Sequence, residues 1–224
     1  MPRLLVSGAN RGIGLELARQ FAAAGWEVIG TARQPQTAAA LAETGARVLP
    51  LEADDERSIT ALKEMLDGTP IDVLIANAGI AINLEAGPAE VTRADFTRTI
   101  RTNTWGPLAL ARALKPNIAA SERRTCCAMS SLMSSISAND WGTQYGYRAS
   151  KAALNAAWVG LADEWRPEGI TCLLLRPGMV ATDMTEGRGI PVQESVAGMR
   201  QVVEGITAAD AGRIIGYDGL DVPW

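Results

Sequence analysis

The chain has 224 residues, a net charge of −4 and an apolar fraction of 47%. These values are typical of one globular domain with a sizeable core, and they exclude a disordered or disulfide-dense chain. The basic residues are scattered, no apolar run is long enough to cross a membrane, and the first residues do not resemble a signal peptide. We therefore expect a soluble, cytoplasmic protein without nucleic-acid or membrane partners.

The chain contains no histidine and three cysteines, of which Cys126 and Cys127 are adjacent. Without histidine a Ser-His-Asp hydrolase is excluded, and without metal-type cysteine spacing we expect no metal site. Adjacent residues of a strand point to opposite faces, so the cysteines are predicted to be buried free thiols.

The first predicted unit is a strand at residues 3–7, a glycine-rich turn and a helix at residues 13–25. The turn reads Ser7-Gly8-Ala9-Asn10-Arg11-Gly12-Ile13-Gly14. Glycines let the backbone approach a pyrophosphate, and the helix N-terminus offers it free N–H groups. The spacing favours a dinucleotide site, while a tight turn that merely needs positive φ is the alternative.

Strands and helices then alternate along the first half of the chain. Strands are predicted at residues 27–31, 46–51 and 71–76, with helices at residues 36–44 and 58–66. This alternation predicts an α/β Rossmann fold: a single domain, residues 1–224, with a doubly wound parallel sheet of about seven strands flanked by helices.

The second half continues the pattern. After Asn77-Ala78-Gly79 and a loop, we expect a long helix at residues 93–115 that Pro116 ends, and a fifth strand at residues 125–129 followed by serines. A helix at residues 145–166, a strand at 171–175, a helix at 193–204 and a last strand at 213–217 complete the prediction.

The helix at residues 145–166 carries Tyr147 and Lys151, which lie four residues apart and so share one face. Such a pair can move a proton, because a lysine charge favours the phenolate. With three tyrosines and three lysines in the chain, chance pairing at this spacing is rare. A solvated helix face remains the alternative.

The glycine turn, Asn77-Ala78-Gly79, a serine after the fifth strand and Tyr147-x-x-x-Lys151 stand in fixed order. Together they resemble the short-chain dehydrogenase/reductase family over essentially the whole chain. Within the family the sequence is most similar to the C-factor and sniffer-like carbonyl reductases, from its glycine turn, from Tyr147-Arg148-Ala149-Ser150-Lys151 and from its ending, Tyr217-Asp218-Gly219 to Pro223-Trp224.

The resemblance implies the catalytic roles. Tyr147 would exchange a proton with the substrate oxygen, Lys151 would lower the Tyr147 pKa and hold the nicotinamide ribose, and Ser131 would hydrogen-bond the reacting oxygen. Asn103 would hold a water that links Lys151 to solvent. Ser134 is the alternative to Ser131, because Ser131 lies 16 residues before Tyr147, which is longer than the commonest family spacing.

The resemblance also implies that Asn77 lines the ribose side, Thr182 fixes the nicotinamide carboxamide and Glu52 contacts the adenine. The full implied cofactor set is Gly8, Asn10, Arg11, Gly12, Ile13, Gly14, Thr31, Arg33, Glu52, Ala53, Asn77, Ala78, Gly79, Tyr147, Lys151, Pro177, Gly178, Val180 and Thr182.

The end of the second strand has Thr31 instead of an acidic residue, and Arg33 and Arg11 are available for a 2′-phosphate, so NADP(H) is favoured over NAD(H). We expect a reductase of a small or medium carbonyl substrate, with a short substrate loop near residues 183–206. The alternatives are an NAD(P)-dependent alcohol dehydrogenase that uses the same residues, or a non-catalytic dinucleotide-binding protein. The alanine-rich face at residues 149–157 allows a homodimer or homotetramer, and burial within the monomer explains it equally well.

Overall fold

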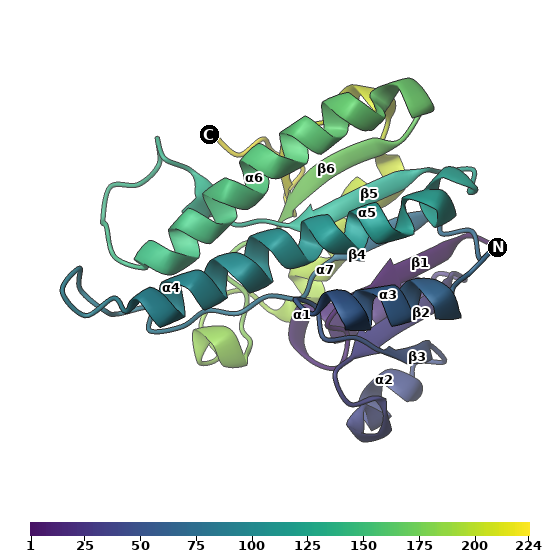
Figure 1. Cartoon of the computed structure of the whole chain (residues 1–224), viewed down its shortest axis with the longest axis horizontal. Helices are drawn as coiled ribbons and strands as arrows, with labels where there is room; N and C mark the ends of the chain where they lie inside the picture. Colours follow the sequence, from purple (N-terminus) through teal and green to yellow (C-terminus); the bar gives the residue numbers. More distant parts are fainter.

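A computed structural model describes residues 1–224 and shows one parallel sheet of seven strands in the order β3-β2-β1-β4-β5-β6-β7 (Figure 1). Every neighbouring pair runs parallel. The strands are β1 (Arg3–Val6), β2 (Glu27–Ala32), β3 (Arg47–Pro50), β4 (Val73–Ala76), β5 (Thr125–Met129), β6 (Thr171–Arg176) and β7 (Ile214–Gly216). The predicted fold class is therefore confirmed.

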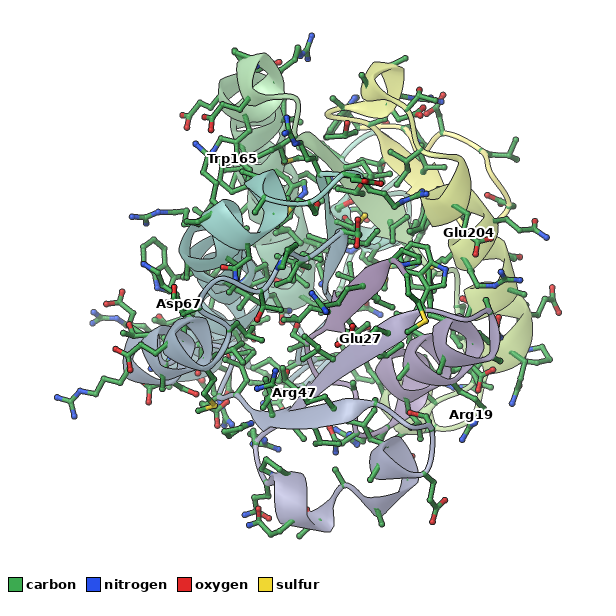
Figure 2. All side chains as sticks on the ribbon, turned by 90° about the vertical axis from the view of Figure 1, so that its right-hand side faces the viewer. Arg19, Glu27, Arg47, Asp67, Trp165 and Glu204 are labelled. Carbon is green, nitrogen blue, oxygen red and sulfur yellow. The ribbon has the colours of Figure 1, made fainter.

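Helices cover both faces of the sheet. They are α1 (Gly12–Ala23), α2 (Ala39–Ala42), α3 (Glu56–Met65), α4 (Arg93–Ile100), α5 (Gly106–Ala119), α6 (Tyr145–Trp165) and α7 (Val192–Gly205). In Figure 2, Asp67 and Trp165 mark the side of α3 and α6, and Arg19 and Glu204 mark the side of α1 and α7. This three-layer arrangement buries the sheet on both faces.

Each face of the sheet has its own hydrophobic core. In β1, Leu5 packs with α3, α5 and α6, while Leu4 and Val6 pack with α1 and α7. Cys126 and Cys127 divide between the two cores in the same way, and all three cysteines are buried free thiols. The period-two alternation of strands thus accounts for the separation of the two cores.

The structure differs from the prediction at two helices. The helix expected at residues 36–44 is a short 3-10 turn, Pro35–Thr37, followed by the single turn of α2. The expectation that Pro116 ends the long helix is wrong, because α5 continues through Pro116 to Ala119. The last turn is held by tertiary contacts: Ile118 is buried, and the Asn117 amide donates to the carbonyls of Leu66 and Thr69. No helix combines the length and apolar character needed to cross a bilayer.

Candidate active site

The predicted glycine turn and Asn77-Ala78-Gly79 lie side by side at the carboxyl ends of the adjacent strands β1 and β4. The chain leaves these two strands in opposite directions across the sheet, so this is the switch point at which open α/β sheets bind ligands. A Cβ at Gly8, which has φ +65°, would lie 3.0 Å from the Ala78 Cα. Glycine at this position lets the two strand ends meet closely.

The N-terminus of α1 has no side-chain cap and no acidic residue in its first turn. In contrast, α3 is capped by the Asp55 side chain and α4 by the Thr92 hydroxyl. The free N–H groups and positive dipole end of α1 therefore lie uncompensated beside Gly12. This arrangement fits an anionic pyrophosphate.

Asn77 supports the glycine turn from within. Its amide donates to the carbonyls of Ser7 (3.0 Å) and Gly8 (3.2 Å). The Ser7 hydroxyl in turn accepts from the backbone N–H groups of Asn77 and Ala78, both at 3.0 Å. The Asn77 side chain thus fixes the shape of the turn, and its place on the ribose side stays a prediction.

Tyr147 and Ser131 come together above the end of β5. Ser131 precedes the 3-10 turn Leu132–Ser134, and Tyr147 lies in the first turn of α6. Burial raises the pKa of Tyr147, and hydrogen bonding by the Ser131 hydroxyl opposes that rise. The Ser131 oxygen accepts from the Met133 N–H at 3.2 Å, so its own proton is free to be donated outward.

Ser134 has a different environment. It is buried, and its hydroxyl donates to the Ser131 carbonyl at 2.5 Å. It also lies 3.3 Å from the Ser130 hydroxyl, which donates to the Asn155 side chain at 2.7 Å. This geometry favours Ser131 over Ser134 as the serine that faces Tyr147.

Lys151 lies one turn after Tyr147 and is buried, and its ammonium donates to the Met129 carbonyl at 2.6 Å. Burial lowers the pKa of Lys151 to about 8. The ammonium lies 5.7 Å from the centre of the Tyr147 ring. The predicted lowering of the Tyr147 pKa by Lys151 is not seen in this arrangement, where burial dominates and Ser131 alone opposes it.

Asn103 lies in a π-helical segment, Arg101–Trp105, between α4 and α5. Its side chain is buried and pairs with both backbone groups of Ile80 at 2.8 Å and with the Ser150 hydroxyl at 3.0 Å. A Cβ at Gly79 would lie 3.2 Å from the Asn103 oxygen and 3.8 Å from the Lys151 ammonium. Asn103 and Lys151 therefore converge on Gly79, and π-helical segments of this kind are frequent at functional sites.

The residues predicted to choose between NAD and NADP differ in exposure. Thr31 is completely buried, and its hydroxyl accepts from the Gly8 N–H at 3.4 Å, so it lies beneath the turn. Arg33 is exposed just beyond β2. Arg11 is exposed and pairs with Asp183, which follows β6, at 2.8 Å. Only the two arginines can reach a ligand at the surface.

On the adenine side, Glu52 is exposed and Ala53 is partly exposed. The neighbouring Asp54 carboxylate is instead bound by Arg101 (2.9 Å) and Thr102 (2.7 Å). Burial raises the pKa of Asp54, but these hydrogen bonds outweigh it and the pKa is lowered overall. Asp54 is thus engaged in structure, and Glu52 remains available to a ligand.

The segment after β6 lies against the glycine turn. The Pro177 carbonyl accepts from Ser195 at 2.6 Å, Gly178 adopts φ +83°, and Val180 is buried. Thr182 reaches the glycine turn, because a Cβ at Gly12 would lie 3.6 Å from its methyl group. The segment therefore faces the N-terminus of α1.

Two contributors to the site were missed by the sequence analysis. Ser7 ties β1 to the end of β4, and the Met129 carbonyl holds the Lys151 ammonium. A serine directly before the glycine turn is a detectable signal for the first. The second is a backbone group, and no residue type marks it.

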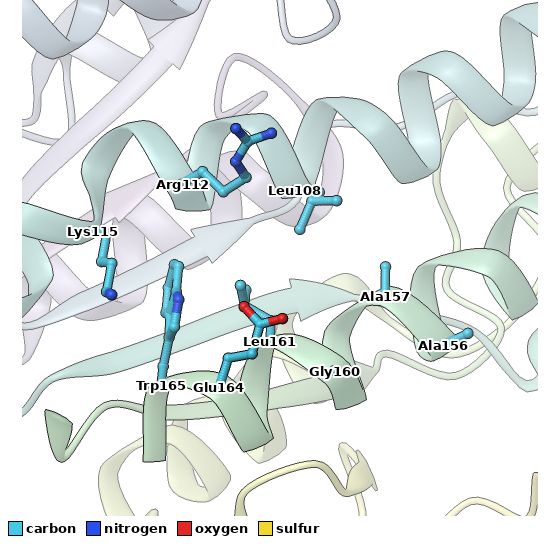
Figure 3. Close-up of a pocket in the computed structure, with 9 residues that line it drawn as sticks. All are labelled: Leu108, Arg112, Lys115, Ala156, Ala157, Gly160, Leu161, Glu164 and Trp165. Carbon is cyan, nitrogen blue, oxygen red and sulfur yellow. The ribbon is translucent and has the colours of Figure 1, made fainter. Parts of the chain in front are cut away.

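A separate groove of about 510 Å³ lies between α5 and α6 (Figure 3). Its walls combine Ala156 and Gly160 with charged side chains from both helices and with Trp165 of α6. The lining residues are Leu108, Arg112, Lys115, Ala156, Ala157, Gly160, Leu161, Glu164 and Trp165. None of the predicted catalytic residues lines this groove.

Comparison with known proteins agrees with this geometry. The family described as enoyl-(acyl carrier protein) reductase matches residues 8–216. The C-signal protein of Myxococcus xanthus is 40% identical over 156 residues, which cover 69% of this chain and 93% of that protein.

Among solved structures, the carbonyl reductase Sniffer of D. melanogaster aligns with a TM-score of 0.92 and 29% identity over the full length of both chains. The NADPH-bound carbonyl reductase from chicken fatty liver aligns with a TM-score of 0.91 and 32% identity, covering 100% of this chain and 99% of that one. With the Rossmann sheet, the glycine turn and the facing Tyr147, Lys151 and Ser131, these matches establish that the chain belongs to the short-chain dehydrogenase/reductase family of oxidoreductases.

Proposed function

We propose that this protein is an NADPH-dependent reductase that converts a small or medium ketone or aldehyde to an alcohol. The observation that carries the proposal is the convergence of Tyr147, Ser131 and Lys151 at the same carboxyl edge of the sheet as the uncapped N-terminus of α1. NADPH, when bound, supplies the hydride that the carbonyl carbon accepts.

Side chains of this protein supply the proton that the carbonyl oxygen takes up. The Ser131 hydroxyl donates a hydrogen bond to the carbonyl oxygen and polarises it. Tyr147 then transfers its phenolic proton to that oxygen and is left as a phenolate. In this proposal Lys151, whose ammonium lies 5.7 Å from the centre of the Tyr147 ring, stabilises the phenolate once it forms, although the resting Tyr147 pKa shows no effect of Lys151. A water held between Asn103 and Lys151 at Gly79 returns the proton from solvent.

The cofactor preference rests on Arg33 and Arg11. Both are exposed and no acidic residue ends β2, so Arg33 is free of a β2 carboxylate that would repel a 2′-phosphate, whereas Arg11 would have to exchange its partner Asp183 for the phosphate. The NADPH named for the chicken carbonyl reductase supports the same choice. The first turn of α1 would hold the pyrophosphate, with Thr182 close to Gly12 at the start of that turn.

Replacing Tyr147 with Phe tests the mechanism. Turnover should fall by at least about 10²-fold while NADPH affinity stays the same, because only the proton donor is lost. Tyr145→Phe is the matched control, since Tyr145 is exposed on the same helix. The assay follows NADPH absorbance with a panel of ketones and aldehydes. An unchanged rate for Tyr147→Phe on a verified substrate refutes the mechanism.

Titrating NADPH and NADH against tryptophan fluorescence tests the cofactor. Arg33→Ala should weaken NADPH binding and leave NADH binding unchanged, because NADH lacks the 2′-phosphate. Tighter binding of NADH by the unmodified protein refutes the preference.

Three other functions make different predictions in the same assays. An NAD(P)-dependent alcohol dehydrogenase would use the same residues and favour alcohol oxidation at cellular cofactor ratios. The name C-signal suggests a regulatory role, and a protein of that kind would bind the dinucleotide without turnover. Crotonyl-CoA probes the enoyl reduction that the family description names. A four-part site of Tyr147, Lys151, Ser131 and Asn103 favours carbonyl chemistry, since mere binding needs no proton donor.

We also propose that the groove between α5 and α6 forms the subunit interface of a homodimer or homotetramer. Ala156 and Gly160 are exposed there, and small residues let helices approach closely. Light scattering should show a dimer or tetramer, and Gly160→Arg should shift it to a monomer. A monomeric unmodified protein contradicts this proposal.

A further inference from the structure

The segment Asp218–Trp224, called the strap below, leaves β7 and is anchored at its start. Gly216 donates its N–H to the Leu220 carbonyl at 2.8 Å, and Val222 donates to the Ile214 carbonyl at 3.0 Å. The Arg213 guanidinium binds both carboxylate oxygens of Asp221 at 3.0 Å. A bidentate pair of this kind fixes direction as well as position.

The strap reaches the loop after β5 at Trp224. The Trp224 carbonyl accepts from the Ser137 N–H (3.0 Å), the Ser137 hydroxyl (2.5 Å) and the Ser135 hydroxyl (3.2 Å). Ser135 is only 2% exposed, and its oxygen also accepts from the Ala138 N–H at 3.1 Å. The Trp224 carbonyl oxygen thus accepts three hydrogen bonds, and the contact is partly buried.

The turn that the strap contacts is continuous with Ser131. The Ser135 N–H donates to the Leu132 carbonyl, and the Ser134 N–H donates to the Ser131 carbonyl, both at 3.0 Å. From the other side, Ser130 is bound to Asn155 of α6. Ser131 thus lies in a short turn that is held between α6 and the strap.

We propose that the strap positions Ser131 against Tyr147, with the Trp224 carbonyl acting through Ser135 and Ser137. These three are positioning residues, since none of them faces the phenol. The positioning of Ser131 rests on the proposed function in one respect, namely that carbonyl reduction is the reaction in which Ser131 and Tyr147 act. Loss of the strap contact lets the turn move and displaces the Ser131 hydroxyl relative to Tyr147.

The double variant Ser135→Ala/Ser137→Ala removes the two hydroxyl donors, and a protein lacking Pro223 and Trp224 removes the acceptor. Ser135→Thr/Ser137→Thr restores both hydroxyls and should rescue. Ser121→Ala is the matched control, because Ser121 is also a buried serine whose hydroxyl bonds to the backbone, beyond the end of α5. Thermal unfolding shows which variants are folded.

The first readout is the ionisation of Tyr147 itself and needs no substrate. For each variant, the ultraviolet absorbance of tyrosinate is recorded as a function of pH. The same measurement is made on that variant with Tyr147→Phe added. The difference between the two curves gives the ionisation of Tyr147. Lys151 is the other titratable group at the phenol and is retained throughout. Both strap variants should titrate at least about 0.5 pH unit higher than the unmodified protein, because Ser131 stabilises the phenolate. The Thr variant and Ser121→Ala should not shift.

The second readout is kinetic, with NADPH and 4-nitrobenzaldehyde as the probe pair. The strap variants should lose at least about tenfold in kcat, while the dissociation constant of NADPH stays within about twofold, since displacement of a reacting group by about 1 Å is costly. A folded strap variant with unchanged Tyr147 ionisation overturns the inference. If the ionisation shifts but the unmodified protein reduces no carbonyl compound, the positioning stands and the proposed function fails.

Discussion

Replacing Lys151 with Met should stabilise the protein at neutral pH while abolishing activity. Lys151 is buried, and its pKa of about 8 lies about 2.5 pKa units below the ordinary value of 10.5. At about 1.4 kcal/mol per pKa unit, holding the charged ammonium in the fold costs roughly 3 to 4 kcal/mol. The methionine side chain is unbranched like that of lysine, is one heavy atom shorter and carries no charge.

The variant also loses the hydrogen bond to the Met129 carbonyl, and a hydrogen bond from a charged donor contributes about 1.5–3 kcal/mol. The net expectation is a gain of about 0.5–2 kcal/mol near pH 7. Between pH 8 and pH 10.5 the unfolded chain holds the Lys151 proton more tightly than the folded one, so the stability of the unmodified protein rises with pH. The advantage of Lys151→Met should therefore shrink across this window.

Urea unfolding followed by tryptophan fluorescence at about pH 7 and about pH 10 measures the effect. Lys63→Met is the matched control, because Lys63 is exposed on α3 and should give no pH-dependent difference. A Lys151→Met protein that is less stable than the unmodified protein at neutral pH, or a stability difference that does not change with pH, would refute the argument from burial.

Three further predictions concern single side chains. Gly14→Ala would place a Cβ 2.3 Å from the Gly8 carbonyl oxygen. The variant should lose about 1–3 kcal/mol of unfolding free energy in urea and should no longer bind NADPH. Gly160→Ala, in contrast, should gain up to about 1 kcal/mol of unfolding free energy. Ser131→Ala should reduce kcat and raise the ionisation pH of Tyr147, and a larger effect of Ser134→Ala on both would reassign the catalytic serine. Asp55→Ala removes the cap of α3 and should cost about 1 kcal/mol in urea unfolding without changing kcat; an altered kcat would contradict a purely structural role.

Local patterns in the sequence were enough to predict the sheet and most of its helices. The apolar runs of β1, β4 and β6 and the period of α1, α6 and α7 appear where the pattern placed them, within a few residues. The pattern failed at Pro116, because the burial of Ile118 and the hydrogen bonds of Asn117 keep the last turn helical despite the missing N–H. Tertiary packing commonly overrides local propensity in this way.

The sequence by itself indicated the principal side chains of the candidate site, because the spacing of Tyr147 and Lys151 and the glycine turn are local features that need no long-range contact. Only the tertiary structure decided how those groups are used. Strand order brings the glycine turn next to Gly79, burial removes Thr31 from the surface, and Met129 supplies the carbonyl that holds Lys151. The order of pKa effects at Tyr147, with burial ahead of the Ser131 hydrogen bond, likewise depends on which chain segments cover the phenol, and residue spacing along one helix carries no information about that.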